Sequence, residues 1–389
     1  MKAGWQRKTL GEVCIVDKRQ GIYKGLPYIG LEHIESHTGR FIGSTEPVTV
    51  KSSTFRFSPE HLLYGRLRPY LNKVMLPDFT GHCSTEIFPL KPHPELMREF
   101  LQYWFLMDAT VEQIDATSTG ARMPRANMNA VLDFTFLLPP LPEQQRIVAI
   151  LDEAFDSIAI AKANAEKNLQ NARTLFESYL QTVFSQRGEG WEEKKLSDVA
   201  ENISTGPFGT MLHKSDYIPD GIPLVNPMNI VDSRIVPSSK MMVNEETRDR
   251  LRGYVLKAGD IVIARRGELG RCALVTEQEE GWLCGTGSFF VRLSDCMDGK
   301  FFVALFGSPQ FKTLLDSNAV GTTMSSLNHS ILNDLPILVP PIEVQRAIMA
   351  KADELLLETQ RLESIYQQKL AALDELKKSL LHQAFNGDL

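Results

Sequence analysis

The sequence predicts a mixed α/β protein in which two similar globular units alternate with two long helices, and two observations carry this prediction. The first is an internal repeat, because motifs of the first half return in the same order in the second half. The second is composition: residues 143–186 and 343–385 contain neither proline nor glycine and are rich in helix-forming residues. We expect globular units at 1–141 and 188–341, and helices at 142–187 and 342–389.

The repeat is clearest at two proline pairs. Residues 138–146 read apolar, Pro-Pro, apolar, Glu-x-Gln-Arg, and residues 339–346 read the same, with Pro142 as one extra residue in the first copy. Further matches keep the same order: Gly120, Met123 and Asn127 with Gly321, Met324 and Asn328; Cys83, Thr85 and Phe88 with Cys284, Thr286 and Phe289; and Trp5 with Trp191. A chance likeness of proline-rich segments would not keep several motifs in order, so the chain is a duplicated domain.

Each predicted helix carries one apolar seam. Apolar residues recur in steps of mostly four and three, which is the heptad pattern of helices that pack together. The seam residues are Ile147, Leu151, Ala154, Ile158, Ala161, Ala165, Leu169, Ala172, Phe176, Tyr179 and Val183, then Ile348, Ala352, Leu355, Thr359, Leu362, Tyr366, Leu370, Leu373 and Leu380. Both seams shift by one residue at Leu169 and Leu370, where a strict heptad would use Asn168 and Lys369.

Chain connectivity gives the direction of helix packing. The first helix leaves the first unit and reaches the second unit, where the second helix starts. Two matched seams favour burial against each other over the alternative of two separate surface helices, so we expect an antiparallel coiled coil and an internal pseudo-twofold repeat. Within the units we expect strands at 13–16, 61–64, 260–264 and 289–293, and helices at 100–107 and 301–306.

Composition and charge exclude several classes of protein. No apolar run approaches the ~18–20 residues of a membrane-spanning helix, and the N-terminus lacks a signal-peptide core, so we expect a cytoplasmic protein. The 5 cysteines form no Cys-x-x-Cys, so neither a disulfide framework nor a metal site is expected. The formal net charge of −6 opposes unassisted binding to a phosphate backbone. A nucleic-acid-binding role would therefore need segregated charge and help from partners.

Two sets of cations are candidates for contact with DNA bases. Base edges are read mainly by Arg, Asn and Gln side chains, and arginines follow a predicted strand at equivalent places in both units. The candidates are Arg66, Arg68 and Lys73 in the first unit and Arg265, Arg266 and Arg271 in the second. The alternative interpretation is that these are solvated loop charges with surface ion pairs.

A glycine-containing loop before each helix is the second candidate site. Backbone N–H groups and hydroxyls there could hold phosphate, with Arg122, Arg125, Asn127, Thr322, Thr323 and Asn328 as the side-chain candidates. The alternative is that these loops only shape a turn at the joint with the helix. We expect Met123 and Met324 in the core, and Trp5, Trp191, Cys83 and Cys284 as packing residues.

An enzyme is the main alternative class, and its motifs are missing. The proline pairs follow Leu138 and Val339, which cannot hydrogen-bond an adenine amino group as the polar residue of a methyltransferase motif does. Residues 205–209 are a poor cofactor loop, and no GxxxxGK[ST] phosphate loop occurs. The Glu-x-Lys spacing at Glu192 is a weak nuclease signal. We therefore expect neither catalytic residues nor a cofactor in this chain.

These features together resemble the specificity (S) subunits of type I restriction–modification systems. The resemblance covers essentially the whole chain and is carried by LPYIGLEHI, GIPLVNPMNI, AGDIVIARRGELGR, the two proline-pair motifs and LLHQAFNGDL. The chain departs from the family pattern at Glu343-Val344, where the usual motif has Glu-Gln. It also departs at Glu60-His61, which stands in place of Gly-Asp.

The resemblance implies that each unit is a target-recognition domain that reads one half of a split, asymmetric double-stranded DNA sequence, while the helices set the gap between the halves. It also implies two methyltransferase subunits docked on the helices, together with nuclease–translocase subunits. S-adenosylmethionine, ATP and magnesium would belong to those partners. The helix residues concerned are Glu143, Gln145, Arg146, Glu343, Gln345 and Arg346. The recognition subunit of a related modification system, a silent exchange copy, or a coiled-coil scaffold without DNA binding would share parts of this pattern.

Overall fold

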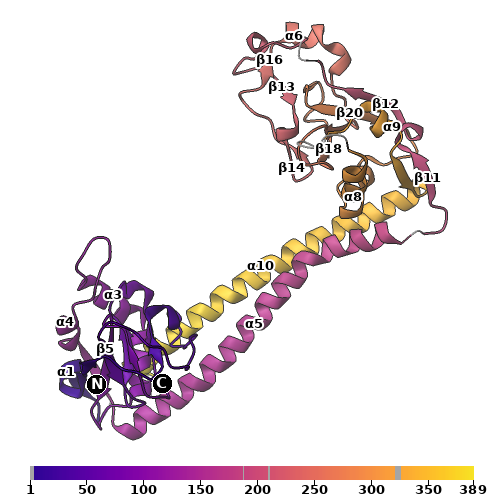
Figure 1. Ribbon diagram of the computed structural model, residues 1–389. Helices are drawn as coiled ribbons and strands as arrows, with labels where there is room; N and C mark the ends of the chain where they lie inside the picture. Colours follow the sequence, from indigo (N-terminus) through magenta and orange to yellow (C-terminus); the bar gives the residue numbers. More distant parts are fainter. Residues whose placement is uncertain (1–3, 187, 209–210, 320–325) are drawn as a thin grey trace. The chain divides into compact units, whose positions relative to one another are not determined.

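The computed structural model describes residues 4–186, 188–208, 211–319 and 326–389 (Figure 1). The chain forms two compact units, Met1–Lys167 with Tyr366–Leu389, and Asn168–Ile365. We call these unit 1 and unit 2. Each contains one globular head, head 1 (residues 4–140) or head 2 (residues 188–341), and parts of both long helices. Among the described residues, no helix is long and apolar enough to cross a membrane.

Two helices of equal length follow the heads, as the sequence predicts. Helix α5 spans Leu141–Ser185 and helix α10 spans Ile342–Asn386, with 45 residues each. The predicted seams are confirmed, because every seam residue in both helices is buried or half-buried. The shift in each seam is confirmed too: Leu169 and Leu370 are half-buried, whereas Asn168 and Lys369 are exposed.

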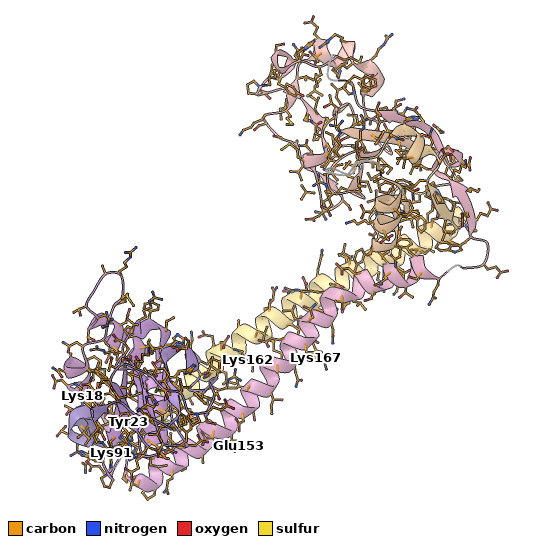
Figure 2. The ribbon with its side chains drawn as sticks, in the orientation of Figure 1. Lys18, Tyr23, Lys91, Glu153, Lys162 and Lys167 are labelled. Carbon is orange, nitrogen blue, oxygen red and sulfur yellow. The ribbon has the colours of Figure 1, made fainter. Side chains whose placement is uncertain are left out.

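The two helices pack antiparallel within each unit. In unit 1, Lys162 of α5, labelled in Figure 2, pairs with Asp374 of α10 at 2.6 Å, and Arg146 donates to the Leu389 carbonyl at 2.7 Å. In unit 2, Arg173 pairs with Glu363 at 2.9 Å. The Tyr179 hydroxyl also donates to the Ile348 carbonyl at 3.5 Å. Exposed ion pairs of this kind stabilise by less than about 1 kcal/mol each, so burial of the apolar seam dominates the stability of the pair.

Head 1 is built on two four-stranded sheets. One has the order β2-β9-β6-β7 and the other β3-β5-β8-β4, and a separate ribbon pairs β1 with β10. The strands are β1 (Gln6–Thr9), β2 (Cys14–Val16), β3 (Gln20–Gly21), β4 (Tyr28–Ile29), β5 (Thr54–Phe57), β6 (Leu62–Gly65), β7 (Val74–Met75), β8 (Gly81–Cys83), β9 (Ile87–Pro92) and β10 (Thr135–Leu138); the helices are α1 (Leu10–Val13), α2 (Arg98–Leu106), α3 (Asp108–Ala116) and α4 (Met128–Leu132).

Head 2 repeats this plan with the order β12-β20-β17-β18 in its main sheet and β16-β13-β19 in its second sheet; the ribbons are β11-β21 and β14-β15. The strands are β11 (Glu192–Lys195), β12 (Ala200–Thr205), β13 (Ile222–Val225), β14 (Ile230–Val231), β15 (Arg234–Ile235), β16 (Met242–Val243), β17 (Ile261–Ala264), β18 (Cys272–Leu274), β19 (Leu283–Cys284), β20 (Ser288–Leu293) and β21 (Pro336–Val339); the helices are α6 (Glu245–Arg250), α7 (Gly299–Phe306), α8 (Pro309–Asn318) and α9 (His329–Asn333).

The duplication extends to the register of the strands. In the main sheets, Leu62 pairs with Leu90 in head 1, and the equivalent Ile261 pairs with Val291 in head 2. The parallel pairs also match: Ile29 lies opposite Cys83, and Val225 opposite Cys284. The predicted strands and short helices are found with ends within two residues of those expected, and the strand predicted at 13–16 begins at Cys14. Residues 10–13 form a helical turn there, which Thr9 and Glu12 cap.

Each head has an apolar core to which the helices contribute. In head 1, Phe385 of α10 packs on Phe100 with ring centroids 4.7 Å apart. In head 2, Phe184 of α5 packs on Phe301 at 5.7 Å. Trp5 is buried and Trp191 is half-buried against Phe301, so both are packing residues as predicted. Cys83 and Cys284 are fully buried, and burial raises the pKa of both thiols.

Candidate nucleic-acid interface

The fold brings the two predicted loops together in both heads. In head 1, the Arg68 N–H donates to the Pro124 carbonyl at 2.7 Å, and the Ala126 N–H donates to the Arg66 carbonyl at 2.9 Å. In head 2, the Leu327 N–H donates to the Arg265 carbonyl at 3.0 Å, and Arg266 forms a β-bridge with Ser326. We call residues 66–73 with 119–127, and residues 265–271 with 326–328, the paired loops.

An arginine at the same place in both heads is fixed by an aromatic ring of the main sheet. The Arg66 guanidinium lies 5.1 Å from the centroid of the Phe88 ring, and the Arg265 guanidinium lies 5.8 Å from that of Phe289. Cation–π contacts of this kind hold a long side chain in one direction. Lys18, labelled in Figure 2, lies 5.0 Å from the Phe88 ring as well, so positive charge gathers at this edge of head 1.

The two heads differ in the group that accepts a hydrogen bond from this arginine. In head 1, Glu86 accepts from Arg66 Nε at 3.0 Å and from Arg125 Nε at 2.9 and 3.1 Å. Partial burial raises the pKa of the Glu86 carboxyl, but the hydrogen bonds and charges of Arg125 and Arg66 outweigh it, so this pKa lies below its usual value. In head 2 the equivalent residue is Gly287, and Arg265 Nε instead donates to the Leu327 carbonyl at 3.3 Å.

Three predicted arginines are exposed and available for an outside partner. Arg68, Arg122 and Arg266 are exposed. Among the residues that the structure describes, their side chains make no hydrogen bond or ion pair. In head 1 two large apolar side chains lie in the same loops, Tyr70 with 46% and Met123 with 45% of its surface exposed. The prediction that Met123 is a core residue is therefore wrong, because its loop turns outward between Gly120 and Arg125.

Most of the other side chains predicted to contact DNA form hydrogen bonds within their own head. Lys73 Nζ donates to the Leu31 and Ile34 carbonyls at 2.7 and 2.8 Å, and Arg271 Nη2 donates to the Pro227 carbonyl. Asn127 and Asn328 cap the short helices α4 and α9 with their side-chain oxygens. Thr322, Thr323 and Met324 lie outside the described residues. A contact of these engaged side chains with DNA remains a prediction, but it would compete with these internal bonds.

A buried glutamine lies at the start of each long helix, Gln144 in α5 and the predicted Gln345 in α10. Gln144 and Gln345 have no exposed surface, whereas Gln145 is exposed. Gln144 therefore corresponds to Gln345, and the proline-pair motifs align without an extra residue. The predicted alignment, with Pro142 as an extra residue and Gln145 opposite Gln345, is therefore wrong, because it matches the Glu-x-Gln-Arg letters and not the buried positions. The acid–base pairs Glu143–Arg146 and Glu343–Arg346 form at 2.8 and 3.2 Å; Glu143 is half-buried, and the other three residues are exposed.

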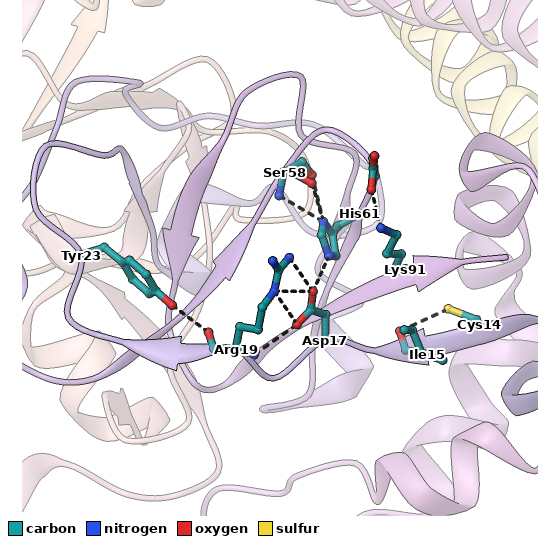
Figure 3. Close-up of polar contacts among 9 residues, drawn as sticks. Cys14, Ile15, Asp17, Arg19, Tyr23, Ser58, His61 and Lys91 are labelled. Atoms are coloured by element: carbon teal, nitrogen blue, oxygen red, sulfur yellow. Dashed lines mark hydrogen bonds and ion pairs between the residues drawn. The ribbon is translucent and has the colours of Figure 1, made fainter. Parts of the chain in front are cut away.

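The residue before the central strand of each main sheet accepts a hydrogen bond from a turn and contacts a second side chain. In head 1, His61 is fully buried, its Nδ1 accepts the Ser58 N–H at 3.1 Å, and its Nε2 lies 3.3 Å from Asp17 Oδ2 (Figure 3). In head 2 the equivalent Asp260 accepts the Lys257 N–H at 2.8 Å and binds Arg292 through two hydrogen bonds of 2.9 and 2.8 Å. His61 thus keeps the turn that Asp260 forms in head 2, but it contacts an acid where Asp260 contacts a base.

Ser58, His61 and Asp17 also have the residue types of a nucleophilic triad. The Ser58 hydroxyl lies 3.0 Å from His61 Nδ1, but that nitrogen already accepts the Ser58 backbone N–H and cannot also serve as a free base. His61 has no exposed surface. We therefore interpret these three residues as structural: their hydrogen bonds hold the turn before strand β6 in place. Within the described residues, no group of His, Cys, Asp and Glu could hold a metal ion.

Comparison with known proteins adds a family. The family model described as type I restriction modification DNA specificity domain matches residues 2–171 and 188–370. Each match begins at a head and extends into the long helix that follows it. The two matches therefore coincide with the duplication seen in the strand register.

The chain is also similar to curated proteins of Escherichia coli. It is 27% identical over 169 residues to the type I restriction enzyme EcoDI specificity subunit, covering 43% of this chain and 37% of that protein. It is 21% identical over 314 residues to the type I restriction enzyme EcoBI specificity subunit, covering 74% and 65%. The chain thus spans less than two thirds of the length of these two relatives.

Among solved structures, the chain resembles the HsdS subunit from Thermoanaerobacter tengcongensis. The TM-score is 0.72 at 21% sequence identity, and the likeness covers 100% of this chain and 98% of that one. This likeness shows the fold, with two heads and two long helices.

Proposed function

Because the chain belongs to the family of type I restriction–modification DNA specificity domains, we propose that it is the sequence-reading subunit of such a complex. One observation carries the proposal: the paired loops occupy the same backbone register in both heads but present different side chains. Direct readout depends on which donors reach the base edges. Two heads with the same fold but different side chains are therefore expected to read two different DNA sequences, which are the two halves of one split, asymmetric target.

The proposal includes partners that supply the chemistry and part of the grip on DNA. The formal net charge of −6 weakens attraction to phosphate, so tight binding would depend on methyltransferase subunits that flank the target. We place those subunits on the exposed faces of α5 and α10, with nuclease–translocase subunits joining them. S-adenosylmethionine, ATP and magnesium would be held by these partners in the cytoplasm.

Co-expression with the methyltransferase subunit of its own system tests this function. The complex is purified, and adenine methylation is mapped across the genome of the host cell. A single split and asymmetric motif supports the proposal. A palindromic motif, no motif, or methylation by the isolated chain would contradict it. Exchange of residues 22–135 for those of another family member should change one half of the motif only.

The role of the helices is tested by insertion. One heptad is added between Lys167 and Asn168 and another between Ile365 and Tyr366, so that each seam continues in phase. Seven residues of helix lengthen each rod by about 10 Å, which corresponds to about three base pairs. We expect the gap to lengthen while both words stay the same. An unchanged gap with retained methylation would mean that the helices do not set the spacing.

A further inference from the structure

Glu86 lies between two arginines that come from different loops of head 1. Arg66 follows strand β6, Arg125 belongs to residues 119–127, and Glu86 directly precedes strand β9. The Glu86 carboxylate accepts from Arg66 Nε at 3.0 Å, and its Oε1 also lies 2.9 Å from Arg125 Nη2. The Arg125 Nη1 in turn donates to the Met123 carbonyl at 3.2 Å. One carboxylate thus ties together the loops that carry the exposed cations.

We propose that Glu86 is a positioning residue for sequence reading by head 1. It holds Arg66 and Arg125 in fixed directions and closes the paired loops, so that Arg68 and Arg122 face the DNA. This inference rests on the proposed function, because it assigns a role within the DNA-reading surface. It goes further by naming the residue that makes this surface rigid.

The charge balance suits a surface that still attracts DNA. Two guanidinium groups and one carboxylate leave an excess of one positive charge, so the set stays attractive to phosphate. Two-pronged hydrogen bonds between Arg125 and Glu86 fix the plane of the guanidinium. A side chain that is already ordered loses less entropy on binding, so a preorganised loop discriminates better between sequences.

Head 2 solves the same problem without an acid. Gly287 stands at the position of Glu86, and a Cβ there would meet the Pro227 Cδ at 2.9 Å. The Arg265 Nε donates to the Leu327 carbonyl instead, so a backbone group closes the paired loops. The proposal therefore concerns one head only, and the half of the target read by head 2 serves as an internal control.

The test uses the full chain in complex with its methyltransferase subunits and Glu86→Gln, which keeps the size of the side chain. Glu60→Gln is the matched control, because it makes the same charge change in an exposed ion pair with Lys91. Glu60 precedes strand β6 and Arg66 follows it, so the control lies at the other end of that strand from the paired loops. The probes are three duplexes, one with the methylated motif found for the wild-type complex and two in which one half is scrambled. Kd is measured against salt concentration for each duplex.

We expect Glu86→Gln to lower discrimination at one half of the motif by about 10-fold, the equivalent of one good base contact. Arg68→Ala should lower discrimination at the same half. Glu86→Gln should still bind DNA in which that half is scrambled. The dependence of its Kd on salt concentration should be steeper by about one released ion, because an arginine that Glu86 neutralises becomes free to contact phosphate. Glu60→Gln should change neither quantity.

Unchanged discrimination in Glu86→Gln would overturn the proposal, as would an equal loss of affinity for all three duplexes. Thermal unfolding shows whether Glu86→Gln is folded. If it is not, the triple variant Arg66→Gln, Glu86→Gln, Arg125→Gln replaces it in the test, because it leaves no unpaired charge among these three positions. That variant should lose the same half of the motif, and wild-type discrimination in it would equally refute the role. If the wild-type complex methylates no split motif, the proposed function itself has failed, which is a separate result.

Discussion

Gln144 and Gln345 lie 201 positions apart and join their helices to their heads by the same three hydrogen bonds. Gln144 accepts the Met97 N–H at 2.8 Å and donates to the Glu95 and Pro139 carbonyls, both at 2.8 Å. Gln345 makes the equivalent bonds with Asp298, Cys296 and Pro340 at 2.8, 2.9 and 2.8 Å. Each side-chain amide thus satisfies three backbone groups at a point where a helix must leave its head in one direction.

Loss of either glutamine should destabilise one unit. Gln144→Leu or Gln345→Leu leaves a buried N–H and two carbonyls without partners, which costs about 2 kcal/mol or more. Heat or urea unfolding of the purified chain measures this, and only the transition of the altered unit should shift. Gln145→Leu is the control, because Gln145 is exposed and surface changes usually stay within about 0.5 kcal/mol. Equal effects of Gln145→Leu and Gln144→Leu would contradict the assignment.

The long-range plan could be predicted from the sequence because its signals are periodic or repeated. The seams of α5 and α10 follow from heptad spacing, down to the shifts at Leu169 and Leu370. The duplicated heads follow from motifs that recur in order. Both signals are spread over many residues, so single substitutions do not erase them.

The interface could be predicted only in part, because its contacts depend on strand pairing and helix phase. Gln144 and Gln145 are the same residue type, and only the phase of α5 decides which one is buried. The sequence alone does not single out Glu86, since its contacts with Arg66 and Arg125 depend on where β9 is placed. The signal that could have found it is the difference between Glu86 and Gly287 at equivalent positions of the repeat.

Thr359 in the seam of α10 offers a stabilising substitution. Its hydroxyl oxygen is buried and has no hydrogen-bond partner among the described residues, so the fold bears the cost of removing it from water. Thr359→Val keeps the shape and removes that cost, which should raise the free energy of unfolding by about 1 kcal/mol. Thr359→Ser keeps the hydroxyl and should not stabilise. A lower melting temperature for Thr359→Val than for the wild-type chain would show that the hydroxyl has a partner.

A surface pocket of about 220 Å³ in head 2 can be filled by a larger side chain of the kind that head 1 has at the same place. The pocket is lined by Phe184, Leu305 and Ile337 among others. At the equivalent places in head 1, the rings of Trp104 and Phe136 lie 5.3 Å apart and are buried. Leu305→Trp should raise the melting temperature of unit 2 by a few degrees, about 2–4 °C for each kcal/mol gained.

The control for filling this pocket is a tryptophan elsewhere on the surface. Leu357 of α10 has 68% of its surface exposed, so Leu357→Trp adds the same side chain without filling the pocket and should leave the melting temperature unchanged. A melting temperature below that of the wild-type chain for Leu305→Trp would mean that the site is too narrow and that overpacking dominates.

Asp17 should make the stability of unit 1 depend on pH in the acid range. Burial raises the pKa of its carboxyl, but hydrogen bonds from Arg19 and His61 outweigh it, so the pKa lies below the usual 3.8. The fold therefore favours the charged form, and this stabilisation is present above pH 3.8 and is lost as the pH falls through the lowered pKa.

Asp17→Asn should lower the melting temperature at pH 5, and the difference from the wild-type chain should shrink toward pH 3, values that bracket the usual pKa. Asp78→Asn, at an exposed carboxylate with no ion pair in the described part of the chain, should show no such dependence. A difference that stays constant between the two pH values would assign the effect of Asp17→Asn to packing instead of charge.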